Sequence, residues 1–248
     1  MASFPLVFLL LFCFRIAESA YIGEIITSFC NENSTLASAQ MSANIDVVLA
    51  QLDANTAKND GFSISTYGQG KDTVYGLGQC RKDVNSSACS TCIHNAAGYI
   101  RQSCYYSANS TDERIYYDSC LLRYSDQKFL GIFDPSIYIN LPYGDKAHKV
   151  NKNPEFFRKQ VGILMNDIIS QAIVPGNKGF FGKGSIAISA SETVYGVVQC
   201  TQDVSTSTCS TCLNTGLSNF PKLCRKLKTT GCRIQYGSCF LRYETDPF

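Results

Sequence analysis

Four stretches of the chain repeat apolar residues every three or four positions, a spacing that places side chains on one face of an α-helix. The two longer stretches begin each half of the chain, and the second follows Asn153-Pro154, which suits a helix cap and a first-turn proline. The two shorter stretches each follow a Cys-x-x-Cys pair. The apolar positions of the four predicted helices are Ile45, Val48, Leu49 and Leu52; Ile93, Ala96, Ala97 and Ile100; Phe157, Val161, Leu164 and Ile168; and Leu213, Gly216, Leu217 and Phe220.

Strand-like runs precede Cys80 and Cys200, and others surround Cys120 and Cys239. The same order of helices and strands occurs in both halves of the chain. It predicts an α+β fold of two units, each an antiparallel sheet with two helices packed on one face.

The apolar positions change parity within the last strand-like run. Ile234 and Tyr236 share one parity, whereas Leu241 and Tyr243 share the other. Because side chains alternate faces along a strand, the change predicts one inserted residue, a β-bulge at Gly237-Ser238 and, in the first half, at Asp118-Ser119. The residues then expected on the face away from the helices are Arg233, Gln235, Arg242 and Glu244, and in the first half Arg114, Tyr116, Arg123 and Ser125.

Two segments of the sequence recur almost unchanged. TVYGLGQC, which ends at Cys80, returns as TVYGVVQC, which ends at Cys200, and CLLRY from Cys120 returns as CFLRY from Cys239. Two copies of one module of about 110 residues explain these matches. The predicted boundaries are residues 20–132 for the first module, 133–154 for a polar linker rich in turn residues, and 155–248 for the second module. The glycine-rich stretch 176–184 is expected to be a loop.

The N-terminus carries the apolar run FPLVFLLLFCF, which is too short to span a bilayer as a helix. It fits a secretory signal peptide over residues 1–19, cleaved after Ser19 or, as the alternative, after Ala20. No second long apolar run follows, so we expect no membrane anchor.

Thirteen cysteines are the unusual feature of the composition. Removal of Cys13 with the signal peptide leaves twelve, and an even number in an oxidising compartment predicts a disulfide framework. The alternative is zinc bound at the two Cys-x-x-Cys pairs. Three Asn-x-Ser/Thr sequons, all in the first half, predict glycosylation at Asn33, Asn85 and Asn109.

The remaining composition excludes several functions. A formal net charge of +2 gives no case for a nucleic-acid partner. Only two histidines, His94 and His148, are present, and the sequence contains no G-x-S-x-G, H-E-x-x-H or Walker motif. We therefore expect a non-enzymatic protein without a cofactor or a metal.

The pattern C-x8-C-x2-C occurs twice, from Cys80 and from Cys200, and each copy is followed by C-x-L-R-Y. It resembles the plant cysteine-rich repeat secretory proteins, which are built from tandem ginkbilobin-like antifungal modules. The resemblance covers essentially the whole mature chain. The resemblance pairs Cys104 with Cys30, and the second module has no counterpart of Cys30. Cys224 therefore lacks that partner, and we infer that it pairs with the additional Cys232. With that inference, the pairs that the resemblance implies are Cys30–Cys104, Cys80–Cys89, Cys92–Cys120, Cys200–Cys209, Cys212–Cys239 and Cys224–Cys232.

The resemblance also implies a mannose site made of an Asn after the first cysteine, an Arg six residues before the last and a Glu five residues after it. The first module has Asn31 and Arg114 but Ser125 at the glutamate position, and the second has Arg233 and Glu244 but no Cys-Asn. An amide, a guanidinium and a carboxylate together can bind vicinal hydroxyls of a sugar. The alternative interpretation is that Arg233 and Glu244 form a surface ion pair.

Charge differs between the halves: residues 20–132 carry a net charge of −3 and residues 155–248 a net charge of +4. Four of the basic residues, Lys222, Arg225, Lys226 and Lys228, cluster on either side of Cys224 and ahead of Cys232. They predict either an ordinary solvated loop or attraction to an acidic cell-wall polysaccharide. The first functional hypothesis is a secreted, carbohydrate-binding protein of antifungal or stress defence. The second is a protein-interaction module that acts as a ligand or co-receptor for receptor-like kinases, and a protease inhibitor is a distant third.

Overall fold

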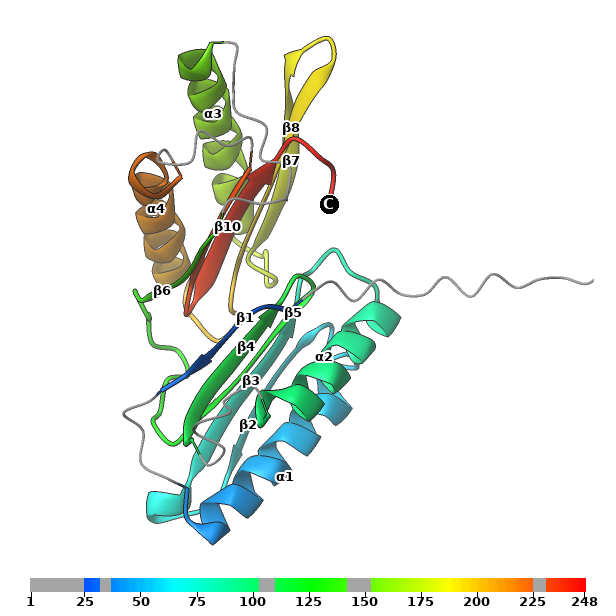
Figure 1. Cartoon of the computed structure of the whole chain (residues 1–248), viewed down its shortest axis with the longest axis vertical. Helices are drawn as coiled ribbons and strands as arrows, with labels where there is room; N and C mark the ends of the chain where they lie inside the picture. Colours follow the sequence, from blue (N-terminus) through cyan, green and yellow to red (C-terminus); the bar gives the residue numbers. More distant parts are fainter. Residues whose placement is uncertain (1–24, 32–36, 103–109, 142–152, 225–230) are drawn as a thin grey trace, which may run out of the picture.

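The computed structural model describes residues 25–31, 37–102, 110–141, 153–224 and 231–248, which form two similar modules (Figure 1). The first module contains β1 (Ile25–Cys30), α1 (Ala39–Asn55), β2 (Phe62–Tyr67), a 3-10 turn (Gly70–Asp72), β3 (Val74–Cys80), α2 (Ser86–Ile100), β4 (Asp112–Tyr117) and β5 (Cys120–Ser125). The second contains β6 (Ile137–Leu141), α3 (Pro154–Ala172), β7 (Phe181–Ser189), β8 (Glu192–Cys200), α4 (Thr206–Leu223), β9 (Cys232–Tyr236) and β10 (Cys239–Glu244).

Each module is an antiparallel five-stranded sheet, and both sheets have the same topology. The strand orders are β1-β4-β5-β3-β2 and β6-β9-β10-β8-β7. The helices lie on the outer sides of the molecule, and the two sheets lie between the two helix pairs (Figure 1). The arrangement confirms the predicted α+β class of two modules.

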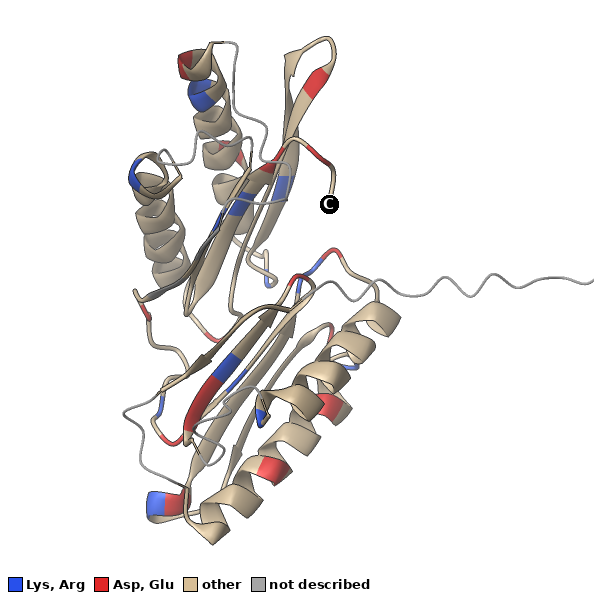
Figure 2. Ribbon diagram, in the orientation of Figure 1, with Lys and Arg blue, Asp and Glu red and all other residues tan. Residues whose placement is uncertain are grey.

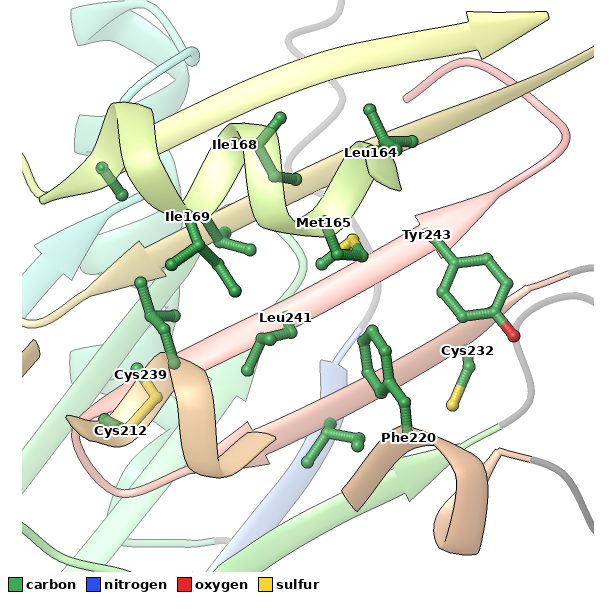
Figure 3. Packing of buried hydrophobic residues seen from close by; sticks show 14 of the residues in the cluster. Leu164, Met165, Ile168, Ile169, Cys212, Phe220, Cys232, Cys239, Leu241 and Tyr243 are labelled. Atoms are coloured by element: carbon green, nitrogen blue, oxygen red, sulfur yellow. A yellow bond between two sulfur atoms is a disulfide. The ribbon is translucent and has the colours of Figure 1, made fainter. Parts of the chain in front are cut away.

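A separate hydrophobic core lies under each helix pair. All four helices begin at a capping side chain that accepts a hydrogen bond from a first-turn N–H, and the capping residues are Ser38, Asn85, Asn153 and Ser205. In the second core, Met165 and Ile168 of α3 pack against the sheet beside Leu241 (Figure 3). The ring of Phe220 meets that of Tyr243 edge-on at 5.6 Å. The predicted apolar helix faces are therefore the core-facing ones.

The predicted β-bulge is wrong, because the run that carries it is two strands and not one. β9 and β10 pair with each other as an antiparallel hairpin, with Gly237-Ser238 as the turn between them. Directly opposite residues of a hairpin share a face, so Ile234 and Leu241 both reach the core although their parities differ. β4 and β5 repeat the hairpin around Asp118-Ser119. The predicted faces of the polar residues stay correct.

Part of the segment 133–154 predicted as linker is a strand. β6 pairs with β9 and forms the edge of the second sheet, as β1 pairs with β4 in the first. The sequence pattern did not predict this strand, because it is only 5 residues long and precedes the first helix of the second module. The second module therefore begins before residue 155.

The glycine-rich stretch predicted as a loop runs into β7. Gly182 lies in this strand directly beneath α3, where a Cβ atom would come within 1.9 Å of the Ile168 carbonyl oxygen. Glycine is needed here because the helix backbone approaches the strand closely.

Five disulfides lie among the described residues, and each joins a predicted pair: Cys80–Cys89, Cys92–Cys120, Cys200–Cys209, Cys212–Cys239 and Cys224–Cys232. Cys30 is also disulfide-bonded, and Cys104, its predicted partner, lies outside the described residues. The cysteines of both Cys-x-x-Cys pairs are in disulfides, so they hold no thiolate for zinc.

The register of the first sheet shows that Cys232 and Cys30 occupy neighbouring positions in their modules. Cys30 on β1 lies directly opposite Glu113 on β4, and the residue equivalent to Glu113 in the second module is Cys232. Neighbouring strands are about 4.8 Å apart, so Cys232 lies one strand away from the position that Cys30 occupies in the first module. Cys224 at the end of α4 reaches that position as well.

Candidate functional site

The faces of the two sheets that point away from the helices carry most of the buried charge. Basic and acidic residues lie on neighbouring strands of both sheets, and others lie on α1, α3 and α4 (Figure 2). Four arginines lie on these inner faces. We call Arg114 and Arg123 the first arginine pair and Arg233 and Arg242 the second, because each pair is directly opposite in its hairpin register.

Where the modules meet, two equivalent glutamines form reciprocal hydrogen bonds. Gln79 donates to the carbonyl oxygen of Cys200 at 2.9 Å, and Gln199 donates to that of Cys80 at 3.2 Å. Each side-chain oxygen accepts a backbone N–H from the other module, from Gln202 and Lys82 respectively. The contacts follow the twofold relation of the two copies and tie the modules together.

The second arginine pair is neutralised by the first module. Asp118, in the β4–β5 turn, accepts from Arg242 at 2.6 Å and from Arg233 at 3.1 Å. It also binds Arg81 at 3.0 Å. One carboxylate of the first module thus holds two arginines of the second.

The first arginine pair is neutralised from a different place. Asp134, which follows the first module, accepts from Arg114 at 2.8 Å and lies 3.8 Å from Arg123. The residue equivalent to Asp118 in the second module is Gly237, where a Cβ atom would come within 2.5 Å of the Asp134 carboxylate. Gly237 therefore leaves the space that Asp134 occupies.

An aromatic ring covers each of the four guanidinium groups. In the first module, the ring centre of Phe29 lies 5.3 Å from the guanidinium carbon of Arg114, and that of Phe129 lies 3.8 Å from the guanidinium carbon of Arg123. In the second module, Phe240 lies over Arg233 at 4.8 Å, and Phe248 lies over Arg242 at 4.5 Å. Such cation–π contacts stabilise guanidinium groups that are removed from water.

Burial changes the proton affinities on these faces. Burial, together with the nearby positive charge of Arg114, lowers the pKa of Arg123. Burial raises the pKa of Glu244, although its ion pair with Arg242 opposes the shift.

In the second module, both predicted sugar-site residues are engaged within the protein. Arg233 is only 3% exposed and binds Asp118 of the first module and the side chain of Gln235. Glu244 is hydrogen-bonded to Arg242 Nε. The ion pair predicted as an alternative between Arg233 and Glu244 is replaced by these two separate contacts.

In the first module, the predicted residues lie together at one end of the sheet. Phe29 on β1 is opposite Arg114, and Asn31 follows two positions later with its N–H bonded to the Asp112 carbonyl oxygen at 3.2 Å. Strand alternation therefore places Asn31 on the face of Arg114. Ser125, at the glutamate position, is buried and lies directly opposite Asp112.

Several residues of these faces were not singled out in the sequence. Asp112, Asp118 and Asp134 carry the carboxylates that bind the arginines, and Gln79 and Gln199 join the modules. The recurrence of a glutamine before Cys80 and Cys200 was visible in the repeat. Its role depends on how the modules meet, which the repeat alone does not define.

Some predicted features lie outside the described residues: the signal peptide, His148, the sequons at Asn33 and Asn109, and residues 225–230 of the basic cluster. The third sequon residue, Asn85, is exposed and caps α2 through its side-chain oxygen. None of the helices that the structure describes is long and apolar enough to cross a membrane.

The family model described as salt stress response/antifungal matches residues 29–127 and 144–246. Because the two matches cover both modules, the chain belongs to this family and carries two copies of its domain in tandem.

Individual relatives extend this assignment over the chain. Cysteine-rich repeat secretory protein 55 of Arabidopsis thaliana is 41% identical over 93% of this chain and 85% of its own length. The antimicrobial ginkbilobin-2-like protein of Castanea crenata is 34% identical over 89% of this chain and 87% of its own. These relatives are secretory and antimicrobial proteins, which confirms the predictions of secretion and of a non-enzymatic protein.

A solved structure shares the fold. The crystal structure of the tandem DUF26 ectodomain of the Arabidopsis thaliana cysteine-rich receptor-like protein PDLP8 superposes with a TM-score of 0.75. The alignment covers 90% of this chain and 98% of that one at 24% identity, so it supports the tandem fold alone.

Proposed function

We propose that this secreted protein recognises mannose-type carbohydrate in antifungal or stress defence, and that the first module carries the binding surface. The supporting observation is that Asn31 and Arg114 lie on one face at one end of the first sheet. Arg114 and Arg233 are each 3% exposed and each bonded to a carboxylate, so it is Asn31, which has no counterpart in the second module, that distinguishes the first.

The chemistry of this end of the sheet suits a sugar. The amide of Asn31 carries a donor and an acceptor, and the guanidinium of Arg114 carries donors, one of which Asp134 accepts at 2.8 Å; these are the group types that bind vicinal hydroxyls. Phe29 is 37% exposed beside them and presents an aromatic surface for the C–H groups of a sugar ring. Polar groups grouped beside an apolar ring are typical of carbohydrate sites.

Calorimetric titration of the mature secreted protein with mannose and with a mannan oligosaccharide tests the proposal. We expect binding by the wild-type protein and about 5- to 10-fold weaker binding by Asn31→Ala, the effect of one or two hydrogen bonds. Glu244→Gln in the second module is the matched control and should bind like the wild type. A folded wild-type protein that binds neither sugar contradicts the proposal.

The second candidate function is protein recognition as a ligand or co-receptor of receptor-like kinases. α3 exposes Phe156 and Ile163, seven residues apart and thus on one side of the helix, at 40% and 49%. The shared tandem fold of a receptor-like ectodomain agrees with this candidate. Capture of such an ectodomain that is lost in Ile163→Asp but kept in Asn31→Ala would favour it over sugar recognition.

A further inference from the structure

We propose that the first module binds a small phenol, a single aromatic ring with a hydroxyl group, in a pocket beside the Cys80–Cys89 disulfide. The pocket has a volume of about 100 Å³, and its lining includes the disulfide, Gly61 and Val84 as well as polar groups. It lies at the end of β3 that is farther from Asn31. The proposal is therefore independent of sugar recognition.

A phenylalanine stands at the equivalent position of the second module. Gly61 and Phe180 are equivalent, because the N–H of Cys80 donates to the Gly61 carbonyl oxygen at 2.8 Å and that of Cys200 donates to the Phe180 carbonyl oxygen at 3.1 Å. Both have a positive φ, +79° and +45°. A Cβ atom at Gly61 would lie 3.9 Å from the sulfur of Cys89, so a side chain at this position begins beside the disulfide. Phe180 accordingly packs against the second core.

The conformation of Phe180 indicates that the space suits an aromatic ring. Bulky side chains rarely adopt a positive φ, because the Cβ atom crowds a neighbouring carbonyl oxygen. The second module keeps one here nonetheless. In the cluster against which it packs, Val204 is only 5% exposed, whereas the equivalent Val84 beside the pocket is half-buried. The first module thus leaves open the place that a ring fills in the second.

The polar part of the lining defines the class of aromatic ligand. Lys82 Nζ donates to the carboxylate of Asp60 and to its carbonyl oxygen, the latter at 3.2 Å. An ammonium group has three donors, so one remains for a ligand oxygen, and the carboxylate can accept a ligand O–H. Arg81, which also lines the pocket, is paired with Asp83 and Asp118. Because the charges are balanced, the pocket suits a hydroxyl that stays neutral at pH 7, as a phenol does.

NMR titration of isotope-labelled mature protein with phenol and with toluene tests the proposal. We expect saturable shifts of the Val84 and Cys89 amides at ligand concentrations up to about 10 mM, the range in which a single ring binds. Gly61→Phe copies the second module and should weaken binding of both ligands at least 10-fold. Lys82→Met keeps the side-chain stem and removes the ammonium group. It should reduce the preference for phenol over toluene about 5-fold, the effect of one hydrogen bond.

Phe180→Gly is the matched variant of the second module. It should open a second site, with new shifts at Val204 and Cys209. The residues equivalent to Asp60 and Lys82 are Gly179 and Gln202, so this site should lack the preference for phenol.

Each outcome decides a part of the proposal. Absence of shifts in the folded wild type contradicts it, and so does undiminished binding by folded Gly61→Phe. An unchanged preference for phenol in Lys82→Met contradicts the choice of a hydroxylated ring. If Gly61→Phe does not fold, Phe180→Gly still tests the equivalence, because a folded variant without the second site contradicts it.

Discussion

The two arginine pairs occupy equivalent places in the two modules, yet they are neutralised from different sources. The second pair binds Asp118 from the other module, whereas the first binds Asp134 from the segment that follows its own module. Gly237 stands where a second Asp118 would be and leaves room for Asp134.

The two copies of the module therefore use equivalent faces for different contacts. In the second module, the inner face is used to hold the tandem together, because its guanidinium groups bind the first module. In the first module, the equivalent face keeps a carboxylate and a guanidinium that are close but not bonded, at 3.9 Å. The repeat thus preserves the fold while the polar inner faces diverge.

The largest expected effect is that of removing Asp118. Asp118→Ala leaves three guanidinium groups without their shared carboxylate, and loss of one partner of a buried ion pair costs roughly 3–5 kcal/mol of the free energy of unfolding. Asp134→Ala should cost about 2 kcal/mol, since Asp134 accepts from one guanidinium, that of Arg114, and from the Ser136 N–H, whereas Asp118 binds three guanidinium groups. Thermal and urea unfolding of both variants measures the difference. Equal losses of unfolding free energy in the two variants would contradict the proposed difference between the two arginine pairs.

The next effect concerns Glu113, which the second module replaces with a disulfide cysteine. Burial raises its pKa to about 7, although the nearby Tyr124 hydroxyl and Arg101 guanidinium oppose the shift. The folded state therefore binds the proton more tightly than the unfolded state. The stabilisation is present below the unfolded pKa and is lost as pH rises through about 7, by roughly 3 kcal/mol.

Urea unfolding of the wild type and of Glu113→Gln between about pH 4 and pH 8 tests this linkage. The glutamine variant should lose the decline in stability that the wild type shows over this range. Amide hydrogen exchange, corrected for its intrinsic pH dependence, should show that protection falls in the first module when the pH is raised. Loosening in the second module instead would contradict the assignment to Glu113.

A smaller effect compares two disulfides of different loop length. Replacing both Cys224 and Cys232 with serine should cost about 2–3 kcal/mol, because the crosslink spans only 8 residues. Replacing Cys92 and Cys120, which are 28 residues apart, should cost about 1 kcal/mol more. Denaturant unfolding of the two double variants gives the comparison. The reverse order would show that native packing, and not chain entropy, dominates.

The smallest effect concerns the equivalent helix caps Asn85 and Ser205. In protein made without glycans, Asn85→Ala and Ser205→Ala should each cost about 1 kcal/mol through loss of one capping hydrogen bond. Ser87→Ala destroys the same sequon but keeps the cap, so it should leave the melting temperature unchanged. A loss in Ser87→Ala equal to that in Asn85→Ala would rule out capping as the cause.

Much of the fold could be predicted because its signals are local or repeated. The apolar spacing from Ile45 to Leu52 defined a helix, and the recurrence of TVYG before Cys80 and Cys200 defined the duplication. The parity change at Gly237-Ser238 does not distinguish a bulge from a hairpin turn, because a bulge and a two-residue turn both reverse the alternation. Only the pairing of β9 with β10 distinguishes them.

The candidate site was harder to predict because it depends on strand register and on contacts between modules. Ser125 appeared to leave the first module without a carboxylate, and only the β4–β5 register places Asp112 opposite it. Asp118 and Arg242 are 124 residues apart in sequence, so no local pattern connects them.

We propose that the first module binds sugar while the equivalent face of the second joins the modules. Titration of isotope-labelled mature protein with mannose, followed by NMR shifts of backbone amides and arginine Nε–H groups, tests this division. We expect saturable shifts at Asn31, Phe29 and Arg114 and none at Arg233 or Glu244. Shifts confined to the second module, or no shifts in the folded protein, would contradict the claim.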